Sequence, residues 1–367
     1  MQYKVLLVLL ATACCFNYLP EVEIDLSAPP RQRWKESVRT VLTLYGYENS
    51  FGPVFQFHNE NTFSILAPED YITMANAIRK NFPEYSLELE GIVEEFNRPE
   101  VTFEYLAAWA YFHEIGHITS GTTECTGVLL SIGDQVIHGR NMDQYPGQAR
   151  NIVLHLTVKK DGKYLGESVD WYWFKVGFVT LLKYNVASLE ENWRFGDPLS
   201  KDQLLTFIKQ GVPSLAWAYR EVLVNEKLNT FDKVVSYLEQ NRVACALYNV
   251  IGGTGKDQGV IISRDPFETY PTISLSSVTQ SSNGYKYLVQ TNYDHWEPDP
   301  EEDQRRTIGE NLLAKMQNNL LNEFGVYAVM DTYPIHNEGT FYTVIMNAKY
   351  NRLIAFGQPS ITLFDDE

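Results

Sequence analysis

The sequence has few cysteines, four among 367 residues. Two of them, Cys14 and Cys15, directly follow an apolar N-terminal segment. If that segment is removed, Cys125 and Cys245 are the two that are certain to remain. A small number of cysteines does not build a disulfide framework, so we expect a fold that is held by packing.

Positive charge is also scarce. There are 30 Lys and Arg residues against 46 Asp and Glu, which gives a formal net charge of −16. Nucleic-acid binding needs clustered cations that release counterions from phosphates, so no nucleic-acid partner is expected. An anionic membrane would repel this chain at neutral pH. In an acidic compartment, protonation of carboxylates and of the seven His would remove much of the charge and favour peripheral contact with a lipid surface.

The apolar run at the N-terminus, Val5 to Ala11, is too short to span a bilayer. Lys4 precedes it, and the small residues Ala11-Thr12-Ala13 follow, a pattern typical of a secretory signal peptide over residues 1–15. Cys14 raises a lipoprotein alternative, which Ala11 disfavours at the first position of that motif. The signal predicts a secreted or lysosomal protein, although the sequence contains no Asn-x-Ser/Thr glycosylation site.

The most informative segment runs from Thr122 to Tyr145. Cys125 is followed by a strand-like run, a turn at Gly133-Asp134 and a return strand that ends near Arg140 and Asp143. This pattern predicts a β-hairpin whose pairing brings Arg140 and Asp143 back to Cys125. A thiol attacks carbonyls as the thiolate, which a nearby cation and a nearby base make accessible. An isolated cysteine would more often be a small buried hydrophobe, but this setting indicates a nucleophile.

Four phrases carry a resemblance to a known family: the opening that ends at Trp34, Cys125-Thr126 with Gly139 to Asp143, Val289 to Trp296, and Asp303 to Arg306. They resemble the N-terminal-nucleophile cysteine amidases of the N-acylethanolamine acid amidase and acid ceramidase family. Bile-salt hydrolases and penicillin V acylases are more distant relatives of that family. The resemblance covers most of residues 20 to 348, with a gap at 45 to 81.

The resemblance implies an α+β fold, the αββα four-layer sandwich of Ntn-hydrolases. It also implies a proenzyme that cuts itself between Glu124 and Cys125. The products would be a small α subunit, 16–124, and a large catalytic β subunit, 125–367, which stay together as a heterodimer. The freed α-amine, a group whose ordinary pKa is about 7.7 to 8.0, would then act as the base for its own thiol.

The resemblance further implies an acid amidase that cleaves fatty-acyl amides through a Cys125 thioester, without a cofactor or a metal. N-acylethanolamines are favoured over ceramide because the cysteine count is low. A lipid carrier that has lost its chemistry is another possibility, but every expected reactive residue is present. The implied roles are the following: Cys125 as nucleophile, Asp143 holding the amine, Arg140 and Glu191 around the substrate head group, Asn292 as oxyanion donor, and Arg305 as support. Trp173 belongs to an aromatic run that could line an acyl channel and bind substrate, although core packing is the simpler role for any one of these rings.

A rival motif lies just before the hairpin. His113-Glu114-Ile115-Gly116-His117 matches H-E-x-x-H, in which two His bind zinc and the Glu activates water. The longer form of the motif fails, since Ser120 and Thr123 replace its Gly and His, so a third ligand would have to come from elsewhere. Cys245, within an apolar strand, is expected to be inert core.

The remaining periodicity predicts secondary structure in outline, with no assignment between residues 45 and 81. Strands are expected at 21–26, 151–159, 163 onward, 244–251, 259 onward and 339–348, and helices near 31 and at 86 onward, 103 onward, 202–210, 214–225, 231–241 and 308–321.

Overall fold

The structure is a computed structural model that describes residues 19–119, 124–279 and 284–358. The predicted signal peptide, residues 1–15, lies outside the described residues, and so do residues 120–123 just before the expected cut. Glu124 is described at the backbone level, as the first residue of a strand.

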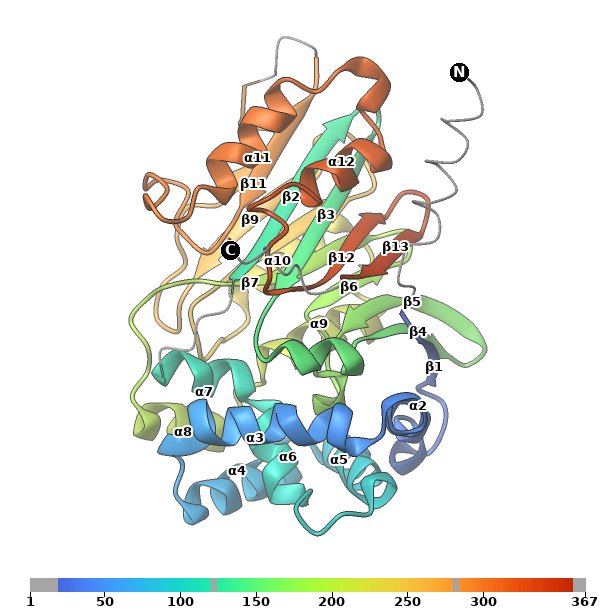
Figure 1. Cartoon of the computed structure of the whole chain (residues 1–367), viewed down its shortest axis with the longest axis vertical. Helices are drawn as coiled ribbons and strands as arrows, with labels where there is room; N and C mark the ends of the chain where they lie inside the picture. The colour runs from blue at the N-terminus through green and yellow to red at the C-terminus, as the bar shows by residue number, and fades with distance from the viewer. Residues whose placement is uncertain (1–18, 120–123, 280–283, 359–367) are drawn as a thin grey trace, which may run out of the picture.

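A five-stranded antiparallel sheet contains the predicted hairpin at its centre (Figure 1). The hairpin strands are joined by Gly133 and Asp134, and Gly133 has a φ of 61°, which a glycine adopts without a steric penalty. The sheet order is β11 (Lys286–Gln290), β2 (Glu124–Ile132), β3 (Gln135–Asp143), β12 (Thr340–Asn347) and β13 (Arg352–Gly357).

An eight-stranded sheet packs against the first one. Its first strand, β1, pairs in parallel with β4. All other neighbouring strands of this sheet pair in antiparallel fashion. The turn between β4 and β5 has positive φ at both Asp161 and Gly162, as the Asp-Gly pair predicts. The order is β1 (Glu21–Asp25), β4 (Leu154–Lys160), β5 (Lys163–Asp170), β6 (Thr180–Lys183), β7 (Ala187–Trp193), β8 (Leu247–Gly253), β9 (Gly259–Arg264) and β10 (Ile273–Ser274).

Helices cover the outer face of each sheet. α11 (Arg305–Ala314) and α12 (Glu323–Met330) pack on the five-stranded sheet, and α9 (Leu215–Val224) and α10 (Phe231–Gln240) pack on the eight-stranded one. Apolar side chains such as Leu129 and Val250 fill the space between the sheets. The layers are therefore helix, sheet, sheet and helix, which is the predicted αββα sandwich.

A helical lobe occupies one end of the molecule (Figure 1). The residues from 45 to 81, which have no sequence-based assignment, form two of its helices. The burial of Phe51, Val54, Phe55 and His58 follows helical spacing, and Asp70 accepts the Ala67 N–H to cap the second helix. The lobe contains α2 (Lys35–Tyr45), α3 (Phe51–Asn61), α4 (Pro68–Asn81), α5 (Pro83–Phe96), α6 (Phe103–Ala110), α7 (Phe112–Ile118) and α8 (Lys201–Lys209).

Short 3-10 helices connect several of these elements. They span Pro30–Gln32, Tyr47–Asn49, Phe63–Ile65, Gly147–Ile152, Trp173–Lys175 and Asn318–Leu320. The helix expected over 308–321 is shorter in the structure: it is α11, which begins at Arg305 and ends at Ala314. The 3-10 helix Asn318–Leu320 follows it, and α12 begins beyond the expected range.

Buried charge ties the lobe to the sandwich. Glu88 of α5 accepts hydrogen bonds from the Trp34 indole at 2.8 Å and from Arg220 Nη2 of α9 at 2.6 Å. The two described cysteines, Cys125 and Cys245, are both free. In the described chain, packing and buried ion pairs therefore connect the residues before Cys125 to those after it.

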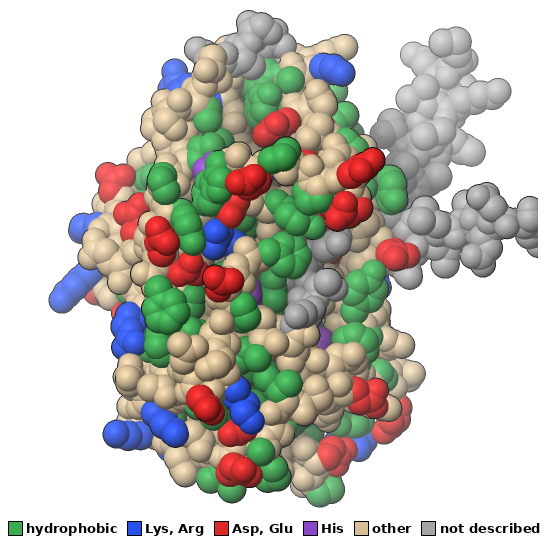
Figure 2. Space-filling view, turned by 90° about the vertical axis from the view of Figure 1, so that its left-hand side faces the viewer, with side chains coloured by type: hydrophobic (Ala, Val, Ile, Leu, Met, Phe, Trp, Pro, Cys, Tyr) green, Lys and Arg blue, Asp and Glu red, His purple; other side chains and the backbone are tan. Residues whose placement is uncertain are grey.

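The surface carries mixed charge. On the face shown in Figure 2, acidic, basic and hydrophobic side chains are interspersed, and the basic ones form no continuous stripe among the described residues. Of the helices in the described ranges, none combines the length and the apolar character that crossing a bilayer requires.

Candidate active site

Cys125 is the second residue of β2, at the open end of the hairpin and far from its turn. The hairpin register pairs Cys125 with Met142 and Gly127 with Arg140. A Cβ on Gly127 would lie 2.0 Å from Glu190 Oε1 of β7, so this face of the hairpin points at the other sheet. Arg140 Nη2 lies 3.8 Å from Cys125 Sγ, as the predicted hairpin requires.

The Cys125 thiol is buried, with 2% of the residue exposed. Burial raises the thiol pKa to about 12, because the positive charge of Arg140 only partly offsets the loss of solvent and the nearby Glu191 and Asp143 charges. Cys125 Sγ also contacts Met142 Sδ at 3.5 Å, a neighbour that sequence reasoning missed. In the uncut chain the thiol is therefore neutral.

Arg305, the first residue of α11, binds the main chain of the nucleophile. Its Nη1 donates to the Cys125 carbonyl oxygen at 3.0 Å, and its Nη2 donates to Asn292 Oδ1 at 2.9 Å. Asp303 holds the guanidinium through an Oδ2 contact of 2.6 Å. The short phrase that contains Asp303 and Arg305 thus brings a fixed cation to Cys125.

Asn292 lies at the nucleophile, but its orientation differs from the expected one. Asn292 Oδ1 accepts from the Cys125 N–H at 3.0 Å, and Asn292 Nδ2 donates to the Trp193 carbonyl at 2.9 Å. Two donors, Cys125 N and Arg305 Nη2, require an acceptor on one side of the amide, and one carbonyl requires a donor on the other. In the uncut chain the NH₂ group is therefore committed to Trp193 and does not face the thiol.

Asp143 ends β3 opposite Glu124, the residue on the other side of the expected cut. Its Oδ1 accepts from Thr340 Oγ1 at 2.6 Å, and its Oδ2 accepts from Asn337 Nδ2 at 3.0 Å. Arg305 Nη1 is 3.6 Å from the same Oδ2. A carboxylate is thus held in place next to the Cys125 backbone.

Arg140 and Glu191 are both buried. Arg140 donates Nη1 to the Val179 carbonyl and Nη2 to Met142 Sδ at 3.1 Å. Burial acts against its charge, but nearby groups that include Cys125 and Glu191 outweigh it and hold the pKa of Arg140 above its usual range. Glu191 Oε1 lies 2.9 Å from His113 Nε2.

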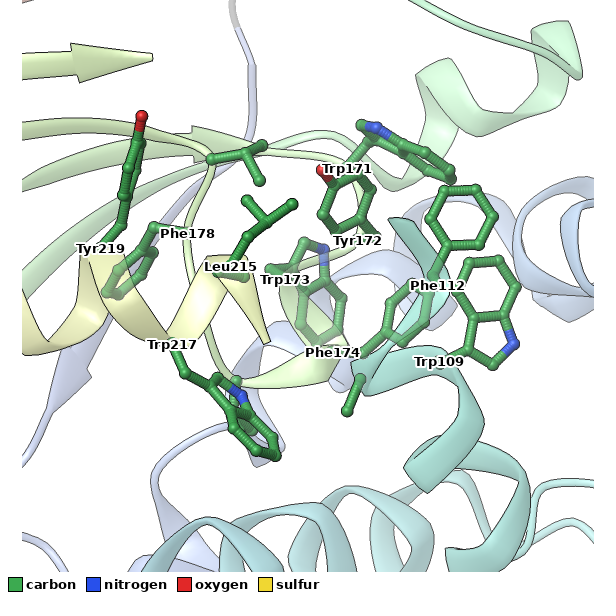
Figure 3. Packing of buried hydrophobic residues seen from close by; sticks show 14 of the residues in the cluster. Trp109, Phe112, Trp171, Tyr172, Trp173, Phe174, Phe178, Leu215, Trp217 and Tyr219 are labelled. Atoms are coloured by element: carbon green, nitrogen blue, oxygen red, sulfur yellow. The ribbon is translucent and has the colours of Figure 1, made fainter. Parts of the chain in front are cut away.

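Trp173 belongs to the hydrophobic core. It is fully buried, donates its indole N–H to the Ile152 carbonyl at 2.8 Å, and contacts Phe51 edge-on at 5.9 Å between ring centroids. Figure 3 shows it among tightly packed aromatic residues next to Phe174, with Trp109 and other rings nearby. The expectation that Trp173 lines an acyl channel is not supported, because these aromatics fill the junction of the lobe and the sandwich.

The H-E-x-x-H motif forms most of α7, but its Glu114 side chain does not lie beside the two His side chains. His113 and His117 share a helix face, whereas Glu114 Oε1 accepts the Leu215 N–H of α9 at 2.8 Å. A zinc protease needs this Glu beside a metal-bound water. The protease alternative is therefore not supported by the geometry.

Comparisons with known proteins agree with this picture. No family model matches the chain. It is 28% identical over 233 residues to the N-acylethanolamine-hydrolyzing acid amidase of Rattus norvegicus, which covers 61% of this chain but only 60% of the relative. The corresponding Cavia porcellus protein is 26% identical over 345 residues, or 90% of this chain and 87% of the relative. Human acid ceramidase is 24% identical over 358 residues, which cover 90% of this chain and 83% of the relative.

A solved structure shows the same fold. The Caenorhabditis elegans N-acylethanolamine-hydrolyzing acid amidase ortholog aligns with a TM-score of 0.55 and 23% identity, over 64% of this chain and all of the solved chain. This likeness confirms the predicted Ntn-hydrolase sandwich. The chain is therefore similar in sequence to both N-acylethanolamine-hydrolyzing acid amidases and acid ceramidases, and it shares its fold with a member of the first group.

Proposed function

We propose that this protein is an acid amidase that hydrolyses fatty-acyl amides after cutting its own chain between Glu124 and Cys125. The observation that carries the proposal is the way Cys125 is held. Its N–H donates to Asn292, its carbonyl accepts from Arg305, and its thiol lies beside Arg140. Any buried cysteine needs partners for its backbone groups, but here the partners are polar side chains from distant segments, and a cation also lies beside the thiol, which supports a nucleophile at a scissile bond.

The cut proceeds through the thiol of the same residue. Cys125 Sγ attacks the Glu124 carbonyl carbon, the Sγ–C bond forms as the C–N peptide bond breaks, and the thiol proton passes to the leaving nitrogen. Water then hydrolyses the thioester, which leaves a carboxylate on Glu124 and restores the thiol. The products are the segments 16–124 and 125–367, a heterodimer from one chain.

Amide hydrolysis repeats this chemistry on a substrate. The freed α-amine of Cys125 takes the thiol proton, the thiolate attacks the acyl carbonyl, and the leaving amine receives that proton. The acyl thioester then reacts with water to release a free fatty acid. A positive α-ammonium beside Sγ also lowers the thiol pKa from its value in the uncut chain.

The observed contacts suggest a separate role for each of these residues. Asn292 Oδ1 and Asp143 are placed to hold the new α-amine, and Arg305 fixes the Cys125 carbonyl. Arg140 and Glu191, whose charges lie near the Cys125 thiol, would contact the polar head of the substrate. For Asn292 to serve as the oxyanion donor, its amide must turn over after the cut and release the Trp193 carbonyl.

The substrate class follows from the named relatives, one group acting on N-acylethanolamines and the other being ceramidases. We favour N-acylethanolamines, with ceramide as the alternative. Substrates of this kind imply contact with lipid surfaces, and the sequence-predicted signal implies a lysosomal or secreted protein.

One experiment tests processing and substrate together. Purified precursor should be incubated at about pH 4.5 to 5, the acidic range in which surface carboxylates begin to lose charge, and the new N-terminus sequenced. Processed protein should hydrolyse palmitoylethanolamide faster than a ceramide of the same acyl length. Cys125→Ala should show neither cutting nor hydrolysis.

The alternatives have distinct outcomes. Faster hydrolysis of ceramide would replace N-acylethanolamines by ceramide as the proposed substrate and would leave the proposed mechanism unchanged. A chain that stays uncut yet is fully active would refute self-cleavage. Tight lipid binding without hydrolysis, together with no labelling of Cys125 by a thiol-reactive lipid, would favour the alternative that the protein is a non-enzymatic lipid carrier.

A further inference from the structure

A second cluster of reactive side chains lies where α7 packs against the segment that enters β8. It consists of His113 and His117 from the helix and Cys245 from the other segment. One ligating atom from each residue lies within 4.8 Å of the other two, and all three residues are buried. Cys245, expected to be inert core, thus lies where a third ligand beside the two His of the sequence motif would have to lie.

The two ring nitrogens of His113 contact different partners, one inside the cluster and one outside it. Nδ1 lies 3.4 Å from Cys245 Sγ, and Nε2 lies 2.9 Å from Glu191 Oε1. A carboxylate beside Nε2 favours the tautomer that carries its proton there and leaves a lone pair on Nδ1. Metal-binding histidines commonly have such a carboxylate behind them.

His117 provides an independent indication. It is 7% exposed, and its Nε2 has no hydrogen-bond partner among the described residues. The ring is fixed by parallel stacking on Trp193, with centroids 3.5 Å apart and an angle of 4° between the planes. Interaction with the Ala246 backbone further restricts it. A buried, immobile nitrogen that lacks a partner is costly unless a ligand satisfies it.

We propose that His113 Nδ1, His117 Nε2 and Cys245 Sγ bind one Zn²⁺ ion. Two imidazoles and a thiolate are ligands that Zn²⁺ prefers, and water can complete a tetrahedron. Binding replaces the Cys245 S–H bond with a Zn–S bond and releases one proton to solvent. Tetrahedral ligands at zinc distances lie roughly 3.5 Å apart, so the widest pair closes by about 1 Å, which small side-chain rotations provide.

The site is structural and does not serve proteolysis. Glu114, the residue that would activate water in a zinc protease, is bonded to the Leu215 backbone instead. The two His precede Cys125 and the thiol follows it. If the chain is cut as proposed above, the ion joins the two products, and this consequence alone rests on the proposed function.

The test uses the full uncut chain, so its result does not depend on the amidase activity. After incubation with Zn²⁺ and removal of free ion, metal analysis should give about one equivalent per chain. Substitution by Co²⁺ should produce an intense near-ultraviolet thiolate-to-metal band and visible bands of tetrahedral intensity. Cys245→Ser should lose the near-ultraviolet band, and His117→Gln should weaken Zn²⁺ binding at least tenfold.

Two control variants separate this site from its neighbours. Cys125→Ala should keep the Co²⁺ spectrum, which excludes the candidate nucleophile as the thiolate ligand, and Glu114→Gln should keep Zn²⁺ binding. Thermal unfolding of each variant without metal establishes that it is folded. Stoichiometry below one tenth in the folded wild type, or a spectrum lost in Cys125→Ala and kept in Cys245→Ser, would overturn the proposal and leave a thiol–imidazole hydrogen bond.

Discussion

At the scale of single residues, Arg305 connects more of the site than any other described side chain considered above. One guanidinium reaches the Cys125 carbonyl, Asn292 and Asp303, and it lies near Asp143. It is 2% exposed, so these contacts act with little screening by water. Burial tends to raise the pKa of Asp303, but the adjacent Arg305 guanidinium lowers it by more, so the pKa of Asp303 lies below its ordinary value.

We expect Arg305→Lys to slow both the cut and amide hydrolysis by roughly 10²-fold, because a single ammonium cannot make parallel bonds to Cys125 and Asn292. The neighbouring Arg306→Lys is the matched control, since Arg306 donates to the carbonyls of Asp294 and Glu297 instead. Rates of N-terminus formation and of fatty-acid release would be compared, together with melting temperatures. Equal rates for the two variants would show that the charge of Arg305, not its geometry, is what matters.

These contacts also show which parts of the site the sequence could predict. Arg140 and Asp143 were predictable because a hairpin turn fixes the register of nearby residues with Cys125. The orientation of Asn292 was not, since it depends on the Trp193 carbonyl, which a distant strand supplies. For Trp173 the sequence left two roles open, because an aromatic run has the same composition whether it lines a groove or fills a core, and the structure has it packed in the core.

At the scale of elements, the two sheets lie close together where β2 packs against β7. Gly127 of β2 faces Glu190 of β7, whose Oε2 lies 3.0 Å from His138 Nε2 of β3. A Cβ at Gly127 would be 2.0 Å from one Glu190 oxygen and 2.7 Å from its carboxyl carbon. A side chain at this position would therefore push the hairpin of Cys125 away from the opposite sheet.

Gly127→Ala should destabilise the protein by about 1 to 3 kcal/mol through overpacking and slow the cut. Gly309→Ala is the control, because a Cβ there would make ordinary contacts of 3.4 Å with Ile335 and Val289, and alanine favours the helix by up to about 1 kcal/mol. Urea unfolding measures both changes. A Gly127→Ala variant as stable as the wild type would mean that Glu190 can move without cost.

Element prediction from sequence succeeded where one pattern dominated. The β2–β3 hairpin, the Asp161-Gly162 turn and helices α8 to α10 lie within a few residues of their predicted positions. α3 was missed because Gly52 and Pro53 at its start are typical of a turn, and Phe57 lies off the buried stripe. α12 was missed because Gly325 and a largely apolar composition give it little amphipathic contrast.

At the scale of the whole molecule, the buried carboxyl of Asp170 links stability to pH. It accepts backbone N–H bonds from Tyr172 and Val179, yet burial raises its pKa to about 6 from an ordinary value of 3.8. The folded state therefore binds this proton more tightly than the unfolded state does. Its contribution to stability is fully present below pH 3.8, falls as the pH rises through about 6, and is absent above that range.

Asp170→Asn should remove this dependence. Between about pH 4 and 8, the free energy of unfolding of the wild type relative to the variant should fall by as much as roughly 3 kcal/mol as the pH rises. Exposed Asp197→Asn is the control, measured by urea unfolding over the same range. A difference that stays constant with pH, or that rises, would contradict the raised pKa of Asp170.

The pairing of β1 with β4 has a further consequence for the intact fold. β1 precedes Cys125 and β4 follows it, and they pair from Glu21 with His155 to Asp25 with Lys159. Without β1, β4 would become an outer strand with unpaired N–H and C=O groups, which is a template for pairing with another molecule. β1 takes the outer position instead, and its exposed Glu21 and Glu23 place negative charge on that edge of the sheet, which disfavours pairing with another molecule. Loss of β1 would therefore replace a charged outer strand by β4 and favour self-association.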